Sequence, residues 1–259
     1  MKDSLPSPGP RPDTQPGVHE TVLAWFPPGG TSRILDAGTG EGALSDALYR
    51  RGYWVVACDV SPSRFRASGV PCIQADLGAT LPFADATFDA VVSSEVLEHI
   101  ENPYHLAREC ARILRPGGTI VLTTPNILSA YSRLHFLFLG VCDFFDTLSG
   151  NRETTFFGTK GHINPVGYPE LRHLLVCAGF EIVDVTTNRD IRVALRETAG
   201  WARFALPALG MVASAARLAT WFLRRTDRVA SQLLSPALLY GEDLIVRGVR
   251  HPRKDCRHV

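Results

Sequence analysis

The sequence has almost no net charge and very few lysines. Its 259 residues hold 27 Lys plus Arg against 26 Asp plus Glu, a formal charge of +1. This balance argues against general binding to nucleic acid, because neutralising phosphates requires an excess of Lys and Arg. Lysine occurs only as Lys2, Lys160 and Lys254, which we interpret as compositional bias rather than function. With 45% hydrophobic residues, the chain can form one large domain, with or without insertions.

Paired cysteine motifs are also lacking, and we expect no leader sequence. None of the six cysteines forms a C-x-x-C pair, and several lie in apolar runs, so we expect reduced, buried thiols in a cytoplasmic protein. Residues 1–17 contain five prolines and no apolar run, which argues against a secretory signal and predicts a disordered arm. A single domain is expected over residues 18–249, followed by a short tail at 250–259.

What the sequence does contain is a glycine-rich stretch, RILDAGTGEG, from Arg33 to Gly42. Ile34 and Leu35 predict a short buried strand, and residues 43–51 have the spacing of a helix. The glycines therefore lie between a strand and a helix, where they allow a sharp turn and the close approach of a ligand. Alternate glycines also occur in ordinary turns, so the stretch alone does not define a ligand site.

Acidic residues follow three predicted strands. Asp36 ends the first strand, where its carboxylate can accept hydrogen bonds from a cationic amino group and would repel a dinucleotide's pyrophosphate. A second strand is predicted at residues 54–60, and Asp59 near its end lies 21 residues beyond the first glycine of the turn. An acid at that position holds ribose hydroxyls in nucleotide-binding βαβ units. A third short strand, residues 72–76, also ends in an acid, Asp76.

At this point the sequence resembles the class I S-adenosylmethionine-dependent methyltransferases, and two later stretches extend the resemblance. They run from Pro82 to His99, ending in SEVLEH, and from Leu114 to Asn126, LRPGGTIVLTTPN. Both are similar to the small-molecule branch, which includes ubiquinone-type and sugar O-methyltransferases. The Asn-Pro-Pro-Tyr type of signature found in many amino-methylating enzymes of DNA and protein is absent, which argues against a nucleobase or glutamine acceptor.

The resemblance implies an α/β fold and a cofactor. The expected architecture is a doubly wound, seven-stranded, mostly parallel Rossmann-like sheet, with an antiparallel last strand at the sheet edge and helical insertions. The implied cofactor is S-adenosyl-L-methionine, with its methionine part held by Asp36 and the glycine turn, its ribose by Asp59, and its adenine by Asp76 and Leu77. The full set of cofactor-binding candidates is Asp36, Gly38, Thr39, Gly40, Gly42, Asp59, Val60, Asp76, Leu77, Ser94 and Glu95.

A first insertion is predicted at residues 127–167, where the family pattern is interrupted. Its many aromatic residues suit a lid over a partly apolar substrate pocket, although a small satellite core explains them equally well. His162 inside this insertion and His99 before it are alternative candidates for a general base, and each could equally be a structural histidine. No metal site is expected.

A second insertion, residues 190–240, is predicted to be helical and basic. Residues 204–223 hold a single charge and reach the length of a bilayer span, but Pro207 and Gly210 interrupt them, so we expect no spanning helix. The segment 196–228 could lie on the inner, anionic membrane surface as a basic amphipathic helix. We favour a solvated arginine face whose apolar side packs on the sheet or on a second subunit.

The function implied by the resemblance is methyl transfer to an oxygen of a small molecule, or of a glycan or lipid-linked saccharide. One alternative is a catalytically silent S-adenosylmethionine-binding or scaffold protein. The other, an NAD-dependent oxidoreductase, is disfavoured by Asp36. We expect no nucleic-acid partner, and the sequence leaves the oligomeric state and the methyl acceptor open.

Overall fold

The computed structural model describes residues 9–145, 161–190 and 232–251. Its strands are β1 (Arg33–Ala37), β2 (Trp54–Asp59), β3 (Cys72–Gln74), β4 (Phe88–Ser94), β5 (Leu114–Pro125), β6 (Phe180–Thr187) and β7 (Asp243–Arg250). The α-helices are α1 (Val18–Leu23), α2 (Ala43–Arg50), α3 (Pro103–Ile113), α4 (Ala130–Leu139), α5 (Tyr168–Cys177) and α9 (Pro236–Tyr240). Two short 3₁₀ turns are η1 (Pro62–Arg64) and η2 (Leu97–His99).

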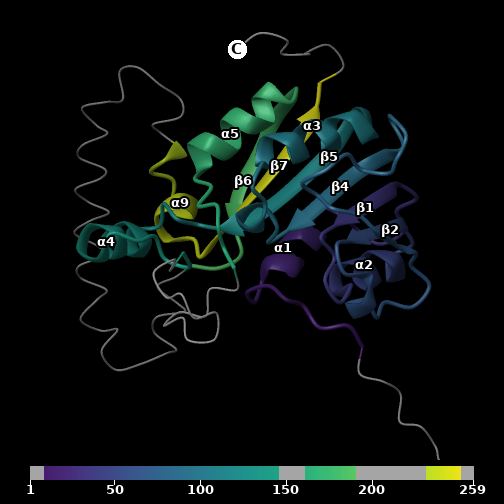
Figure 1. Cartoon of the computed structure of the whole chain (residues 1–259), viewed down its shortest axis with the longest axis horizontal. Coiled ribbons are helices and arrows are strands. Elements are labelled where there is room, and N and C mark those ends of the chain that lie inside the picture. Colours follow the sequence, from purple (N-terminus) through teal and green to yellow (C-terminus); the bar gives the residue numbers. More distant parts are fainter. Residues whose placement is uncertain (1–8, 146–160, 191–231, 252–259) are drawn as a thin grey trace, which may run out of the picture.

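The strands form one seven-stranded sheet in the order β3-β2-β1-β4-β5-β7-β6 (Figure 1). All neighbouring pairs from β3 through to β5 are parallel, and β7 is antiparallel to both β5 and β6. The predicted doubly wound, mostly parallel sheet with an antiparallel last strand is therefore confirmed.

The predicted position of the last strand at the sheet edge is wrong, because β7 lies between β5 and β6. The run Leu244-Ile245-Val246 is buried on both faces, with Leu244 and Val246 in one core and Ile245 in the other. A continuous apolar run suits an interior strand, where helices cover both faces. The edge strand is β6, which alternates and leaves Val183 exposed.

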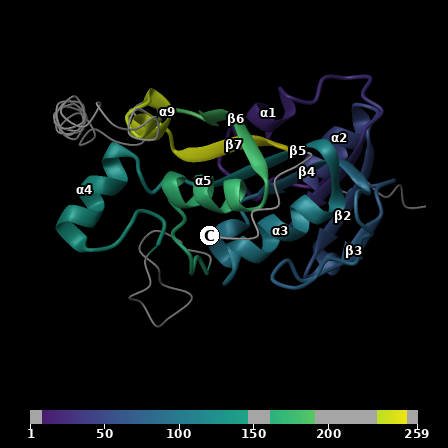
Figure 2. The same cartoon turned by 90° about the horizontal axis from the view of Figure 1, so that it is seen from above.

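Helices cover both faces of the sheet, which gives two cores. Figure 2 shows α3 and α5 on one face and α1 and α2 on the other. Successive strand residues point to opposite faces, so Leu35 packs with α3 and α5 while Ile34 packs with α1 and α2. The strand order reverses between β1 and β4, and in open α/β sheets ligands bind outside the carboxyl ends of the strands at this switch point.

Ser61-Pro62 has the sequence of a helix start, with serine at the N-cap and proline at the first helical position, but the helix that this pattern predicts does not form. Only η1 is present, and Phe65 after it is already extended. Ser61 does not cap a helix through its side chain; instead its backbone amide donates to Asp59 Oδ1 at 2.8 Å. The Asp59 carboxylate therefore organises this turn, and the chain runs on without a helix into β3.

The two predicted insertions are described only in part. The first contains α4, whose exposed side chains include Phe136 and Phe138, while residues 146–160 lie outside the described residues, so the aromatic lid stays a prediction. The basic segment 196–228 also lies outside them. No helix within the described residues combines the length and the apolar composition needed to cross a bilayer.

Residues 9–17 of the amino-terminal arm lie against the domain. The Arg11 amide donates to Glu41 Oε2 at 3.1 Å, and the Arg64 guanidinium pairs with Asp13 at 2.7 Å. This part of the arm, expected to be disordered, therefore runs past the glycine turn, of which Glu41 is a member.

Candidate active site

The turn at residues 36–42, here called the cofactor turn, leaves β1 at its carboxyl end and enters α2. The amides of Gly38 and Thr39 both donate to the Cys58 carbonyl of β2 at 2.8 and 3.3 Å. The Gly40 amide donates to Asp59 Oδ2 at 2.9 Å. These hydrogen bonds fasten the turn to the end of the neighbouring strand β2.

The three glycines of this turn have positive φ angles, but their surroundings differ. A Cβ added at Gly38 would lie 2.3 Å from Val96 Cγ2, and one at Gly42 would lie 2.4 Å from Phe65 Cε2. At Gly40, by contrast, an added Cβ would meet no described atom within 4 Å. Protein packing therefore requires glycine at positions 38 and 42, whereas Gly40 faces open space.

Asp36 is fully buried beneath the turn. Its Oδ2 accepts hydrogen bonds from Thr39 Oγ1 at 2.9 Å and from Ser45 Oγ at 2.5 Å. Burial raises the pKa of the Asp36 carboxyl, and these two hydroxyls offset only part of that rise. A carboxylate in this position is stabilised by a cation. Ser45 was missed from the sequence, although a small polar residue in the first turn of α2 could have pointed to it.

The ends of β2 and β3 place the next candidates at the same edge of the sheet. Both carboxylate oxygens of Asp59 accept hydrogen bonds from backbone amides, Oδ2 from Gly40 and Oδ1 from Ser61. Val60 follows it with its side chain 66% exposed. Asp76 is also exposed, and its Oδ1 accepts a bond from the Gly78 amide at 2.8 Å.

Leu77 is buried and connects this edge to the cofactor turn. A Cβ added at Gly38 would lie 3.3 Å from Leu77 Cδ1. The structure therefore brings the candidates after β1, β2 and β3 to one edge of the sheet.

Beyond β4 the chain makes a tight turn around Glu95, a non-glycine residue with φ of 55°. A positive φ is rare for residues other than glycine, and the residues that adopt it are often found at functional sites. The Glu95 amide donates to the Thr123 carbonyl, and Thr123 Oγ1 donates to Glu95 Oε1 at 2.6 Å. Thr123 Oγ1 also lies 3.0 Å from Ser94 Oγ. Burial raises the pKa of Glu95 to about 7.

The two histidine candidates, 63 positions apart in the sequence, are neighbours in the structure. The ring centroids of His99 and His162 lie 4.7 Å apart in an edge-to-face arrangement. The amides of Ile163 and Asn164 both donate to the Glu98 carbonyl at 2.8 and 3.1 Å, which holds the second segment against the first. We call Glu95, Glu98, His99 and His162 the histidine–glutamate cluster.

Glu98 is the member of this cluster that was not among the predicted site residues. Its side chain is 0% exposed, and burial together with the Glu95 carboxyl raises its pKa well above the usual range. Asp243, at the start of β7, is 1% exposed, and its pKa is raised chiefly by burial and then by Glu95. Glu242 beside it is neutralised by an ion pair with Arg189. SEVLEH contained the signal for Glu98, but nothing local pointed to Asp243.

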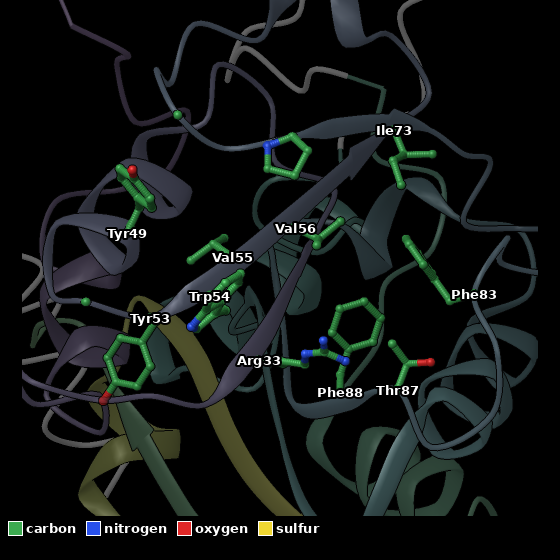
Figure 3. A pocket seen from close by; sticks show the side chains of 13 residues that line it. Arg33, Tyr49, Tyr53, Trp54, Val55, Val56, Ile73, Phe83, Thr87 and Phe88 are labelled. Carbon is green, nitrogen blue, oxygen red and sulfur yellow. The ribbon is translucent and has the colours of Figure 1, made fainter.

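A cavity of about 970 Å³ lies elsewhere, near the amino ends of β1 and β2 (Figure 3). Arg33, Trp54, Ile73, Phe83 and Phe88 are among its lining residues. None of the candidate site residues lines it, so we do not assign the chemistry to this cavity.

The carboxyl-end site and the doubly wound sheet define a protein of the nucleotide-binding α/β class. A model of the methyltransferase domain family matches residues 35–122. A Mycobacterium tuberculosis protein described as a probable S-adenosylmethionine-dependent methyltransferase is 34% identical over 173 residues, 64% of this chain and 55% of the relative. The ubiquinone biosynthesis O-methyltransferase of Xanthomonas campestris is 36% identical over 107 residues, 37% of this chain and 44% of the relative.

Solved structures agree with this fold. An S-adenosylmethionine-dependent methyltransferase from Archaeoglobus fulgidus superposes with a TM-score of 0.57 at 18% identity, covering 90% of this chain and 95% of that one. Residues 35–122 are therefore similar to the methyltransferase domain family, and the Mycobacterium tuberculosis relative is described as S-adenosylmethionine-dependent, so its cofactor is S-adenosylmethionine. The chain spans about half the length of the curated relatives it matches.

The residues at the cofactor turn fit such a ligand. S-adenosylmethionine carries an ammonium group, a ribose and an adenine. The buried carboxylate of Asp36 lacks a described cationic neighbour among the groups that shift its pKa. Gly40 leaves open space for a close approach, and Val60 offers an exposed apolar surface beside Asp59.

Proposed function

We propose that this chain transfers a methyl group from S-adenosylmethionine to an oxygen of a small molecule. The observation that carries the proposal is the buried Asp36 carboxylate beneath a glycine turn whose middle glycine faces open space. A negative charge there attracts the ammonium group of an amino acid and repels a pyrophosphate. This distinguishes the proposed cofactor from a nicotinamide dinucleotide.

Each part of the cofactor has a proposed partner. Asp36 accepts hydrogen bonds from the ammonium group, with Thr39 and Ser45 fixing the orientation of its carboxylate. Asp59 accepts hydrogen bonds from the ribose hydroxyls while it anchors the Gly40 amide. The adenine is proposed to contact Val60, Asp76 and Leu77, and Ser94 and Glu95 are proposed to close the cofactor site from β4.

The cofactor supplies a methyl group that is already activated by its positive sulfur. The contribution of the chain is therefore to align the acceptor and to exclude water, which together can lower a barrier by up to roughly 7 to 11 kcal/mol. An alcohol acceptor must also lose its proton as the new bond forms, and a positioned base contributes a factor of about 10² to 10⁴. His99 and His162 stay the predicted bases, since both lie just beyond β4.

The proposed acceptor, an oxygen of a small molecule, rests on the relatives. The Xanthomonas campestris relative is named a ubiquinone biosynthesis O-methyltransferase, and a phenol is the acceptor chemistry that this name suggests. Saccharide hydroxyls, free or lipid-linked, are the second acceptor class. The histidine–glutamate cluster next to the cofactor turn supplies groups that could receive a proton from either.

The proposal is tested by calorimetric titration of the intact chain with S-adenosylhomocysteine and, separately, with NAD⁺. We expect binding of S-adenosylhomocysteine at micromolar or lower concentration and no binding of NAD⁺. Transfer of a labelled methyl group to a panel of phenols and sugars then tests the reaction. Tighter binding of NAD⁺ would overturn the proposal. Binding without transfer to any phenol or sugar would favour the silent, scaffold alternative.

A further inference from the structure

Three side chains of the histidine–glutamate cluster converge on one point. Glu98, His99 and His162 each offer one donor atom, and these three atoms all lie within 4.8 Å of one another. Among the described residues, this is the one group of three or more His, Cys, Asp or Glu side chains whose possible metal-binding atoms lie this close together.

Glu98 supplies a buried carboxylate oxygen that lacks a donor. Its side chain is fully buried, and Oε2 accepts a hydrogen bond from Thr124 Oγ1 at 3.1 Å. Oε1 is also buried and receives no hydrogen bond from any described donor. Buried polar atoms are nearly always satisfied, so this oxygen calls for an explanation. Either a proton shared with the Glu95 carboxyl or a bound cation would provide one.

The two imidazoles are oriented by backbone carbonyls. His162 Nδ1 lies 2.9 Å from the Phe144 carbonyl, and His99 Nδ1 lies 3.3 Å from the Gly161 carbonyl. A carbonyl can only accept, so Nδ1 is the donor in each contact, and in the neutral ring Nε2 then carries the lone pair. A metal-binding histidine typically has this arrangement, in which its other ring nitrogen donates to a carbonyl or a carboxylate.

The second segment is fixed in place before any ligand arrives. Besides the two amide bonds from Ile163 and Asn164 to the Glu98 carbonyl, Asn164 Nδ2 donates to the Ile100 carbonyl at 3.1 Å. The His162 ring also packs 5.3 Å from that of Phe145. His162 is thus held beside Glu98, while His99 on the other side is exposed.

We propose that Glu98, His99 and His162 bind one divalent transition-metal ion. Two imidazoles and one carboxylate suit Zn²⁺, Mn²⁺, Fe²⁺ or Co²⁺, whereas Mg²⁺ and Ca²⁺ prefer oxygen ligands alone and Cu⁺ prefers sulfur. Donor atoms around such an ion lie about 3.3 Å apart, given metal–ligand bonds of about 2.0 to 2.1 Å. The donor atoms lie within 4.8 Å of one another, so they need to approach by at most about 1.5 Å on binding, a movement that the exposed His99 side chain can make.

Three protein ligands leave at least one coordination position open, as in catalytic rather than structural metal sites. Val96, which lies in the same turn, packs against Gly38, so the ion would sit close to the cofactor turn. If the proposed methyl transfer holds, on which this step rests, the open position takes the acceptor hydroxyl. The ion lowers the pKa of that hydroxyl, and its proton passes to solvent. His99 and His162 would then be ligands rather than general bases.

The experiment measures metal binding directly and does not depend on methyl transfer. The intact chain is dialysed against a chelator and titrated with Zn²⁺, Mn²⁺ and Co²⁺, and the visible spectrum of bound Co²⁺ reports nitrogen and oxygen ligands. We expect one equivalent of metal to bind, and we expect His162→Ala and His99→Ala each to weaken binding at least tenfold. His99 is exposed, so His99→Ala tests the site even if His162→Ala disturbs the packing on Phe145.

His173→Ala is the matched control. His173 lies on α5, and its Nε2 is 3.6 Å from Cys177 Sγ, a pair that could bind metal adventitiously at the surface. We expect this variant to bind the first equivalent of metal as the wild type does. The proposal is overturned if binding is not stoichiometric, or if both cluster variants bind as tightly as the wild type. S-adenosylhomocysteine titrations of the same samples separate this outcome from failure of the proposed function.

Discussion

Two polar regions at the carboxyl ends of neighbouring strands each bury a carboxylate, but they differ in how its oxygens are hydrogen-bonded. The cofactor turn after β1 buries one carboxylate, Asp36, and supplies it with two hydroxyl donors. The histidine–glutamate cluster after β4 buries Glu98 and leaves one of its oxygens without a described donor. The Asp36 carboxylate is already held in position by hydrogen bonds before a ligand binds. The Glu98 oxygen without a described donor still needs a proton or a cation.

The two regions also differ in how they are assembled. The donors to Asp36 come from three and nine residues along the chain, within one strand, turn and helix. The cluster depends on Thr123, Thr124 and His162, which reach it from β5 and from the insertion after α4. Local assembly explains why the first region can be recognised in the sequence, and tertiary assembly explains why the second is harder to see.

The largest effect is expected from Asp59→Ala, which removes the anchor of the cofactor turn. The Gly40 and Ser61 amides lose their acceptor, and so does the bound ribose. Because hydrogen bonds to charged groups contribute about 1.5 to 3 kcal/mol each, S-adenosylhomocysteine affinity should fall by about 100-fold or more, measured by calorimetry. Asp184→Ala is the control and should bind normally; Asp184 is a partly exposed acid on β6 that lies 3.9 Å from Arg247. Unchanged affinity in Asp59→Ala would contradict the assignment of the turn.

A smaller effect is expected from Gly40→Ala, for which the chain offers a close control. Gly40 and Gly117 both have positive φ angles, and an added Cβ meets no described atom within 4 Å at either position. Alanine should therefore cost each variant about 1 to 2 kcal/mol of folding free energy from backbone strain. Only Gly40→Ala should also lose S-adenosylhomocysteine affinity, by about tenfold, because its methyl group enters the proposed ligand space.

The measurement is a pair of chemical denaturation curves with a pair of calorimetric titrations. Equal loss of affinity in both glycine variants would show that strain alone is responsible. Equal retention of affinity would mean that no ligand approaches Gly40, and the cofactor would have to be placed elsewhere.

The fold was predictable wherever its signals are local. The order of β1, α2 and β2 followed from an apolar strand, a glycine turn and helical spacing. The place of β7 was not predictable from spacing, because its pairing joins Thr119 to Val249 across most of the carboxyl-terminal half. The helix after β2 stops after one 3₁₀ turn because Phe65 is already extended, and its ring lies against Gly42, a contact between segments that propensity does not include.

The candidate site shows the same division. Asp36 and Asp59 were singled out by their spacing from the glycines, and the structure places both at the cofactor turn. His99 and His162 were singled out one at a time, as alternatives, but the structure places them together. Glu98 had a signal in SEVLEH, whereas Thr123 and Asp243 acquire their roles only through burial and contacts across the sheet, which no window of sequence contains.

The smallest expected effect is that of pH on the affinity for S-adenosylhomocysteine, through the charge of Asp36 in the cofactor turn. Burial raises the pKa of Asp36, so as pH falls its carboxylate takes a proton at a higher pH than an ordinary aspartate does. The ammonium group of the ligand stays charged, and a neutral Asp36 no longer attracts it. As pH falls through the raised pKa of Asp36, the affinity for S-adenosylhomocysteine should therefore fall several-fold, and above that pKa it should stay constant. Adenosine, which lacks the amino-acid part, is the matched ligand, and its affinity measured by the same titration should change little. If both ligands weaken in parallel, the pH dependence belongs to the fold or to the nucleoside part of the site rather than to the ammonium contact. A loss confined to S-adenosylhomocysteine would locate the positive group of the cofactor beside Asp36 and leave the histidine–glutamate cluster for the acceptor.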